Sequence, residues 1–95
     1  MRITDIVWKD RFVEKLLIKH GVSVKEAEET LYCKPLIRKI AKGQVHGENV
    51  YSAMAHINNG RYLIVFFILK KNGTILPISA RDMDPSERKY YEKHR

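Results

Sequence analysis

The stretch NGRYLIVFFILKKNG, residues 59–73, decides the fold. Within it, residues 61–69 are apolar at nearly every position, which is typical of a strand that is covered on both faces. The flanking Asn59-Gly60 and Asn72-Gly73 pairs predict type I′ turns, because both central residues of such a turn must tolerate a positive φ. We therefore expect a central strand joined to a neighbour on either side by a tight hairpin. The two neighbours fall at residues 50–57 and 74–81.

Two further strands are expected, and one of the predicted strands is irregular. Pro77 cannot donate a hydrogen bond to a neighbouring strand, so residues 74–81 should lie at an edge or bulge there. Residues 36–41 form a further short strand, and the apolar residues Ile3, Ile6, Val7 and Trp8 indicate an opening one.

Two helices are predicted near the N-terminus. Apolar residues recur at helical spacing over residues 10–20, and Gly21 is a natural stop. Ser23 and Glu26 then form the S-x-x-E capping box of a second helix, which ends near Cys33.

A last helix begins at Pro85, with Asp84 as its N-cap and Glu87 three residues after the cap. The predicted order is a short strand, two helices, an antiparallel meander and a terminal helix. This is an α+β fold, and residues 1–95 contain no linker or repeat, so we expect one domain.

The composition excludes several classes of protein. Hydrophobic residues make up 44% and charged residues 31%, a balance that excludes wholesale disorder. The net charge of +7 favours a polyanionic partner, with nucleic acid first. The single cysteine, Cys33, cannot form an internal disulfide, so the cytoplasm is the expected location. The longest apolar stretch is too short to cross a bilayer, and we expect no membrane partner.

No cofactor or metal site is expected either. The histidines and the one cysteine lack the spacing of metal ligands, and the glycine-rich motifs of nucleotide-binding and hydrolase sites are absent.

A basic stretch is the first candidate for a functional surface. No acidic residue occurs between Thr30 and Gly47, a segment that carries four basic residues and ends near His46: Lys34, Arg38, Lys39 and Lys42. Such a segment suits contacts with RNA phosphates. Alternatively it is a solvated edge strand protected by its lysines.

Two arginines at predicted strand ends are candidates for holding a phosphate. Arg61 follows the first turn and Arg81 ends the ISAR strand. Arginine presents a planar fork that binds phosphate through two hydrogen bonds. Either arginine can instead pair with a carboxylate, such as Asp82 or Glu87.

Two other groups extend this surface. His46 and Glu48 lie two residues apart, so on a strand they would face the same way and could divide the roles of general acid and base. In the last helix Arg88 and Tyr91, with their neighbours, offer phosphate contacts and base stacking. The alternatives are an ordinary loop pair and a tyrosine that anchors the helix.

Taken in order, these residues resemble the BrnT family of toxins. The matching residues are Ile6, Trp8, Lys19-His20-Gly21-Val22-Ser23, Ala27, Pro35, His46, Glu48, Tyr51, Gly60-Arg61, Ile78-Ser79-Ala80-Arg81, Glu87-Arg88 and Tyr91. The chain departs from the family's usual residues at Lys9, Phe12, Leu16 and Val50.

The resemblance implies a RelE-like fold and a metal-independent endoribonuclease of a type II toxin–antitoxin system. It implies a BrnA-like antitoxin as partner, with a homodimer or a heterotetramer with that antitoxin as the assembly. In this interpretation Arg61 and Arg81 stabilise the phosphate, Glu48 is the base or an orienting group, and His46 is the acid. Lys70 and Lys71 add positive charge. The alternatives are a basic module that binds nucleic acid without cleaving it, and a protein-interaction module.

Overall fold

The computed structural model describes residues 5–42 and 49–95, which form one sheet and three helices. The elements are β1 (Asp5–Ile6), α1 (Asp10–His20), α2 (Val24–Tyr32), β2 (Leu36–Lys42), β3 (Asn49–His56), β4 (Tyr62–Leu69), β5 (Thr74–Asp82) and α3 (Pro85–His94). This order confirms the predicted α+β arrangement, including the short N-terminal strand, the meander and the C-terminal helix.

The most apolar strand lies at the centre of the sheet. The strand order is β1-β5-β4-β3-β2, in which β1 runs parallel to β5 and the other neighbours are antiparallel. Beyond Ile6, which pairs with Ile75, β1 ends and leaves part of β5 without a ladder partner on that side.

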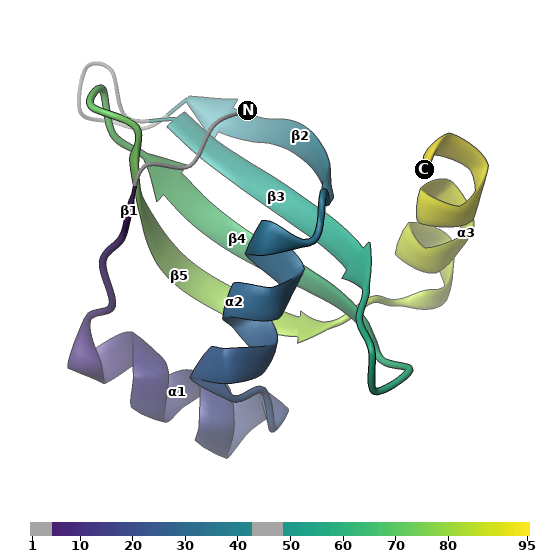
Figure 1. Cartoon of the computed structure of the whole chain (residues 1–95), viewed down its shortest axis with the longest axis horizontal. Helices are drawn as coiled ribbons and strands as arrows, with labels where there is room; N and C mark the ends of the chain where they lie inside the picture. Colours follow the sequence, from purple (N-terminus) through teal and green to yellow (C-terminus); the bar gives the residue numbers. More distant parts are fainter. Residues whose placement is uncertain (1–4, 43–48) are drawn as a thin grey trace.

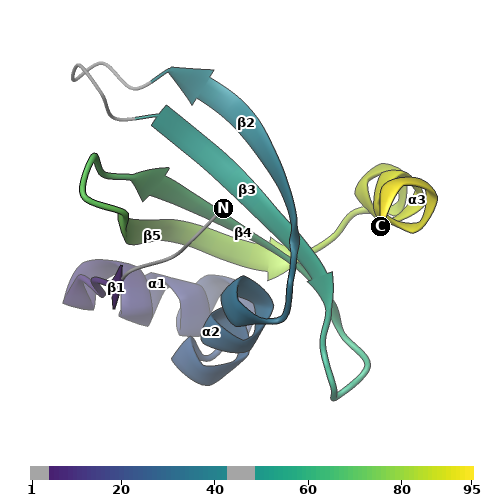
Figure 2. The same cartoon turned by 45° about the horizontal axis from the view of Figure 1, so that its top comes forward.

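The sheet separates the helices into two layers (Figure 1). Helices α1 and α2 cover one face and α3 lies against the other (Figure 2). Alternate residues of β4, such as Leu63 and Val65, pack in the main core with Ala27 and Leu31 of α2. We call the opposite face of the sheet the α3 face. Ile64 of β4 belongs to a smaller core on this face. The rest of that smaller core consists of Met54, Tyr91 and the half-buried Leu36, Tyr62, Phe66, Met83 and Tyr90.

The predicted helix boundaries are confirmed by their capping contacts. Ser23 and Glu26 exchange the two hydrogen bonds of a capping box at the start of α2. Asp84 and Glu87 do the same at the start of α3. Gly21 has a φ of 62° directly after α1, a backbone conformation that glycine adopts without strain.

The two hairpin turns differ from the predicted type I′. Among the described non-glycine residues only Lys34 has a positive φ, so Asn59 is not in a type I′ turn. Instead the Gly60 amide donates to the Ile57 carbonyl at 3.0 Å, and Gly60 alone takes a positive φ, of 92°. This is a three-residue loop with a type I turn and a glycine bulge. Asparagine favours it because its side chain accepts the amide hydrogen of Arg61 at 3.1 Å. The turn at Asn72-Gly73 has the same pattern.

This extra loop residue shifts the register of the hairpin by one. A two-residue turn would pair His56 with Leu63, whereas the observed turn pairs His56 with Tyr62. Because successive side chains point to opposite faces, a shift of one residue changes which face each pair occupies. His56 and Tyr62 consequently share the α3 face.

The prediction of an irregular strand at Pro77 is confirmed. Phe67 pairs with Pro77 but Phe66 pairs with Ser79, so Ile78 is the extra residue of a β-bulge. The bulge shifts the following residues by one position. Arg81 therefore lies opposite Ile64, on the α3 face.

Strand β2 forms one outer edge of the sheet. A second bulge lies between Lys39 and Ala41, and the extra residue, Ile40, is 49% exposed. Because neighbouring residues alternate, Arg38 faces the α3 side opposite Ser52, whereas Lys39 faces the other side opposite Tyr51.

Candidate nucleic-acid interface

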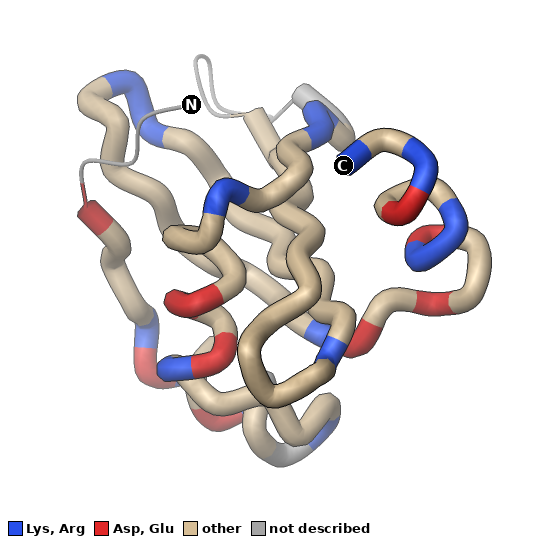
Figure 3. The backbone as a smooth tube through the Cα atoms, turned by 45° about the vertical axis from the view of Figure 1, so that its right-hand side comes forward, with Lys and Arg blue, Asp and Glu red and all other residues tan. Residues whose placement is uncertain are grey.

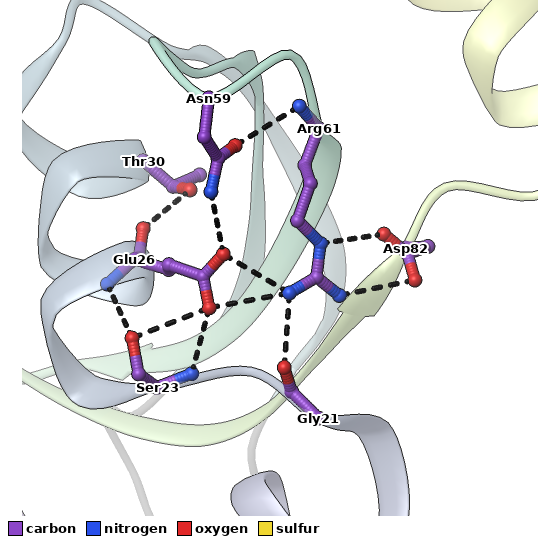
Figure 4. Close-up of polar contacts among 7 residues, drawn as sticks. All are labelled: Gly21, Ser23, Glu26, Thr30, Asn59, Arg61 and Asp82. Carbon is purple, nitrogen blue, oxygen red and sulfur yellow. Dashed lines mark hydrogen bonds and ion pairs between the residues drawn. The ribbon is translucent and has the colours of Figure 1, made fainter.

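Arg61 is held by a network of ion pairs and hydrogen bonds at the end of the β3–β4 hairpin (Figure 4). Its Nη1 atom donates to Glu26 Oε2 at 3.0 Å and to the Gly21 carbonyl oxygen at 2.9 Å. Its Nε and Nη2 atoms donate to the two carboxylate oxygens of Asp82, each at 3.1 Å. All three guanidinium nitrogens therefore contact acceptors within the chain.

The network also fixes the charge of Glu26. The Ser23 backbone amide donates to Glu26 Oε1 at 3.1 Å, and the Asn59 side chain donates to Oε2 at 2.8 Å. These bonds, the Ser23 amide first, and the Arg61 guanidinium lower the pKa of Glu26 from 4.5 to about 2. Glu26 therefore stays ionised well into the acidic range and remains a partner for Arg61.

Arg61 was expected to hold a phosphate, with pairing to a carboxylate as the alternative. The structure places it in the carboxylate pair. Its side chain is only 27% exposed, and its fork is filled by Asp82. A catalytic role for Arg61 stays a prediction, but the geometry supports a structural one.

Arg81 makes a second ion pair, on the opposite face of the sheet. Its Nη1 and Nη2 atoms donate to the two oxygens of Glu87 at 2.7 and 2.9 Å, and Nη1 also donates to the Asp82 carbonyl oxygen at 3.2 Å. The bond to Arg81 holds the pKa of the Glu87 carboxyl below its ordinary value. Arg61 and Arg81 thus flank Asp82, but one is tied to α2 and the other to α3.

Among the described residues, four arginines lie over aromatic rings of the α3 face. Arg95 has the longest distance, 5.9 Å to the centre of the Tyr91 ring, and the other three lie closer. The guanidinium carbon of Arg88 lies 3.8 Å from the centre of the Tyr62 ring, and that of Arg38 lies 4.1 Å from the centre of the Tyr90 ring. Arg81 lies 5.4 Å from the centre of the Phe66 ring. These are cation–π contacts, and they hold the arginines in an ordered array.

Two histidines complete this array. The rings of His56 and Tyr62 are stacked with centres 4.0 Å apart and planes 4° apart. The rings of His94 and Tyr90 are stacked with the same separation. The sequence analysis gave no role to His56, Tyr62 or Phe66, because their shared face depends on the register of the hairpin; a correct turn type would have revealed it.

Charge is distributed unevenly over the two layers (Figure 3). Acidic residues lie on α1, on α2, at the end of β5, on its connection to α3 and on α3 itself. Between Thr30 and Arg81 the sequence carries a single acidic residue, Glu48. This part of the chain therefore carries a net positive charge, which suits a polyanion.

The sequence also matches a known protein family. Residues 8–87 match the family described as the ribonuclease toxin BrnT of type II toxin–antitoxin systems. The chain belongs to the BrnT family. None of the curated proteins compared with the chain matches it.

The other residues predicted for RNA binding by this BrnT-family chain are scattered. Lys34, Lys39 and Lys71 are exposed, but Lys39 faces away from the α3 side. Lys70 lies beside Lys71 at the β4–β5 turn. Tyr91, expected on the RNA-binding face, is only 9% exposed. The structure supports the alternative role, in which Tyr91 anchors α3 to the sheet. Its hydroxyl accepts the His56 amide hydrogen at 3.3 Å.

The predicted acid and base, His46 and Glu48, lie outside the described residues, and so does the side chain of Lys42. The backbone of Lys42 pairs with Asn49 at the end of the sheet where β4 finishes. Arg61 precedes the other end of β4, about 23 Å away for an eight-residue strand. The structure does not bring Arg61 near the anchor points of residues 43–48.

Two other findings concern the described residues alone. Within 5–42 and 49–95, no three His, Cys, Asp or Glu side chains are grouped so that they can hold a metal ion. No helix in the same ranges is long and apolar enough to span a bilayer.

The Arg61 network predicts an acid sensitivity. The pKa of Glu26 is lower in the folded than in the unfolded chain, so its contribution is complete above about pH 4.5 and is lost as the pH falls towards 2. We expect wild type to lose about 1 kcal/mol more stability than Glu26→Gln between about pH 6 and about pH 3, after allowance for solvent screening. Urea unfolding at both pH values measures this. Glu14→Gln, at an exposed position of α1, is the control and should lose as much stability as wild type. Parallel losses in wild type and Glu26→Gln would contradict the prediction.

Proposed function

We propose that the chain is an endoribonuclease that binds single-stranded RNA on the α3 face and acts in the cytoplasm. The observation that carries the proposal is the set of three arginines on aromatic rings of that face: Arg38 on Tyr90, Arg81 on Phe66 and Arg88 on Tyr62. Family membership supplies the activity class, because BrnT proteins are described as ribonuclease toxins.

The chemistry of single-stranded RNA suits this array. Its phosphates need cations with several donors, and its unstacked bases need flat partners. Arginine held against an aromatic ring supplies charge with little further loss of side-chain freedom on binding. Bases in a duplex are already stacked on one another, so a single strand gains most from such a face.

In the proposed reaction the substrate's own 2′-hydroxyl oxygen attacks the adjacent phosphorus. A base takes the hydroxyl proton, the bond to the 5′-oxygen breaks, and an acid protonates that oxygen. The products are a 2′,3′-cyclic phosphate and a 5′-hydroxyl. We propose that no metal ion takes part and that Glu48 and His46 transfer the protons. Arg81 lies opposite Ile64, five residues along β4 from Leu69, the partner of Asn49, and we propose that it stabilises a phosphate of the bound strand.

Arg61 has a different place in this proposal. It fixes the Asp82 carboxylate, while the Asp82 carbonyl accepts a hydrogen bond from Arg81. Arg61 therefore positions Arg81 from the opposite side of the strand. The carboxylate of Glu87 occupies the fork of Arg81 as a phosphate would, so RNA has to displace it.

Cleavage is tested with purified protein and a labelled single-stranded RNA in EDTA. We expect cleavage that persists in the chelator, with fragments that end in a 2′,3′-cyclic phosphate. Mass spectrometry of the fragments identifies this end. A gel shift without cleavage would instead support the second candidate, a binding module, which the same arginines over aromatic rings favour. Cleavage that EDTA abolishes would exclude the metal-independent mechanism.

The role of Arg81 is tested with variants on both sides of its ion pair. Arg81→Ala should slow cleavage about a hundredfold, and Arg81→Lys should restore it only in part. Glu87→Gln keeps an oxygen for the α3 capping box but removes the competing charge. It should tighten RNA binding roughly threefold to tenfold.

The matched control is Arg11→Ala, since Arg11 also lies over a ring, that of Phe12, but on α1. It should leave cleavage unchanged. The phosphate role is wrong if Arg81→Ala cleaves RNA as fast as wild type while folded, as judged by circular dichroism.

We also propose that a BrnA-like antitoxin covers this face. Strand β2 is an outer strand of the described sheet and carries the exposed Arg38 and Lys39, and the exposed Lys34 lies just before it. These cations suit an acidic segment, and the strand edge suits an added strand. Co-expression with neighbouring reading frames should yield a tight complex, either with one copy of each protein or a heterotetramer; the antitoxin-free chain is expected to be a monomer or a homodimer. Size-exclusion chromatography with light scattering distinguishes these assemblies. Purification of the chain alone, without harm to cells that overproduce it, would contradict the proposal.

A further inference from the structure

His56 occupies a prominent place on the α3 face. It is the last residue of β3. Across the hairpin it pairs with Tyr62, the first residue of β4. Its side chain is exposed, whereas Tyr62 is half-buried. The imidazole therefore covers the tyrosine and itself faces solvent.

The Tyr62 ring lies between two planar groups. The imidazole of His56 is nearly parallel to it at 4.0 Å, and the guanidinium carbon of Arg88 is 3.8 Å from its centre. One face of a tyrosine ring has room for only one planar group at this separation, so His56 and Arg88 stack on opposite faces. The result is a three-layer stack in the order His56, Tyr62, Arg88.

This stack is held rigid by its neighbours. Tyr91 meets the Tyr62 ring edge-on, with centres 6.1 Å apart and planes 80° apart. The Tyr91 hydroxyl also accepts the backbone amide hydrogen of His56. Because Tyr91 is buried, its contacts anchor both His56 and Tyr62 to the core. A ligand that extends the stack loses little entropy in ordering it.

The open end of the stack has the properties of a base-binding platform. The outer face of the His56 ring is flat and π-bonded, which suits any nucleobase. Arg88 adds positive charge to the same stack, where the adjacent phosphate of a bound strand benefits from it. The arrangement recurs nearby, where Tyr90 lies between His94 and Arg38.

We infer that the exposed face of His56 binds one unstacked nucleobase of single-stranded RNA. This inference rests on the proposed function, because it assigns a base to the face on which RNA is proposed to bind. It gives His56 a role in substrate selection: a strand with a free base binds well, and a duplex whose bases are paired does not.

The experiment measures the affinity for a fluorescently labelled, single-stranded 2′-O-methyl RNA oligonucleotide, which cannot be cleaved. His56→Ala should weaken binding by roughly fivefold to 150-fold, the loss expected for one stacked base. His56→Phe keeps a flat ring without a proton-transferring group, and it should retain the wild-type affinity. His20→Ala, at the end of α1 on the other side of the sheet, is the control and should bind as wild type.

A second measurement reports the stacking of the base directly. A 2-aminopurine base placed in turn along the oligonucleotide should lose fluorescence at one position when wild-type protein binds, and His56→Ala should restore that fluorescence while His56→Phe should not. Equal affinities of wild type and His56→Ala would overturn the inference, and so would equal losses in His56→Ala and His56→Phe. If wild type itself neither binds nor cleaves RNA, the proposed function fails instead.

Discussion

The ion pair between Arg61 and Glu26 joins most parts of the fold. Glu26 belongs to the capping box that starts α2, and it also accepts hydrogen bonds from Arg61 and Asn59 of the β3–β4 hairpin. Arg61 in turn binds Asp82 at the end of β5. One carboxylate therefore fixes where a helix begins and how the hairpin lies against it. A further hydrogen bond, from the Asn58 amide to Glu29 at 2.7 Å, ties the same hairpin to α2.

The same residue type serves two purposes on the two faces of β5. Arg61 is enclosed by acceptors from α2, β5 and the connection between α1 and α2, and it acts as a structural joint. Arg81 has a single carboxylate partner, Glu87, and lies over the ring of Phe66 in the array on the α3 face. Position in the sheet, not residue type, separates the two roles. A basic surface for a polyanion is thus compatible with a pair of arginines that are both ion-paired in the free protein.

Local signals predicted the elements well, because capping boxes and glycine stops act within a few residues. Both boxes, at Ser23 and at Asp84, lie where the sequence places them. Register was harder to predict, since a type I turn with a glycine bulge and a type I′ turn share the Asn59-Gly60 pair. The residues that contact the arginines of the site were the hardest to predict. Arg61 meets a carboxylate 35 residues away, and the rings under Arg38 and Arg88 come from other elements. The sequence places Arg61 and Arg81 at strand ends but does not indicate on which face of the sheet each lies, because the bulge at Ile78 shifts Arg81 by one position.

The bulge at Ile40 has a consequence for how copies of the chain meet one another. A long, flat and regular edge strand is a template for pairing with an identical edge. In β2 the extra residue increases the local twist of the strand, and two like charges, Arg38 and Lys39, directly precede it. Two copies approaching edge to edge would bring these cations together, which disfavours ordered self-assembly into fibrils. The same two cations attract a partner of opposite charge, so this edge favours an acidic partner over a second copy of the chain.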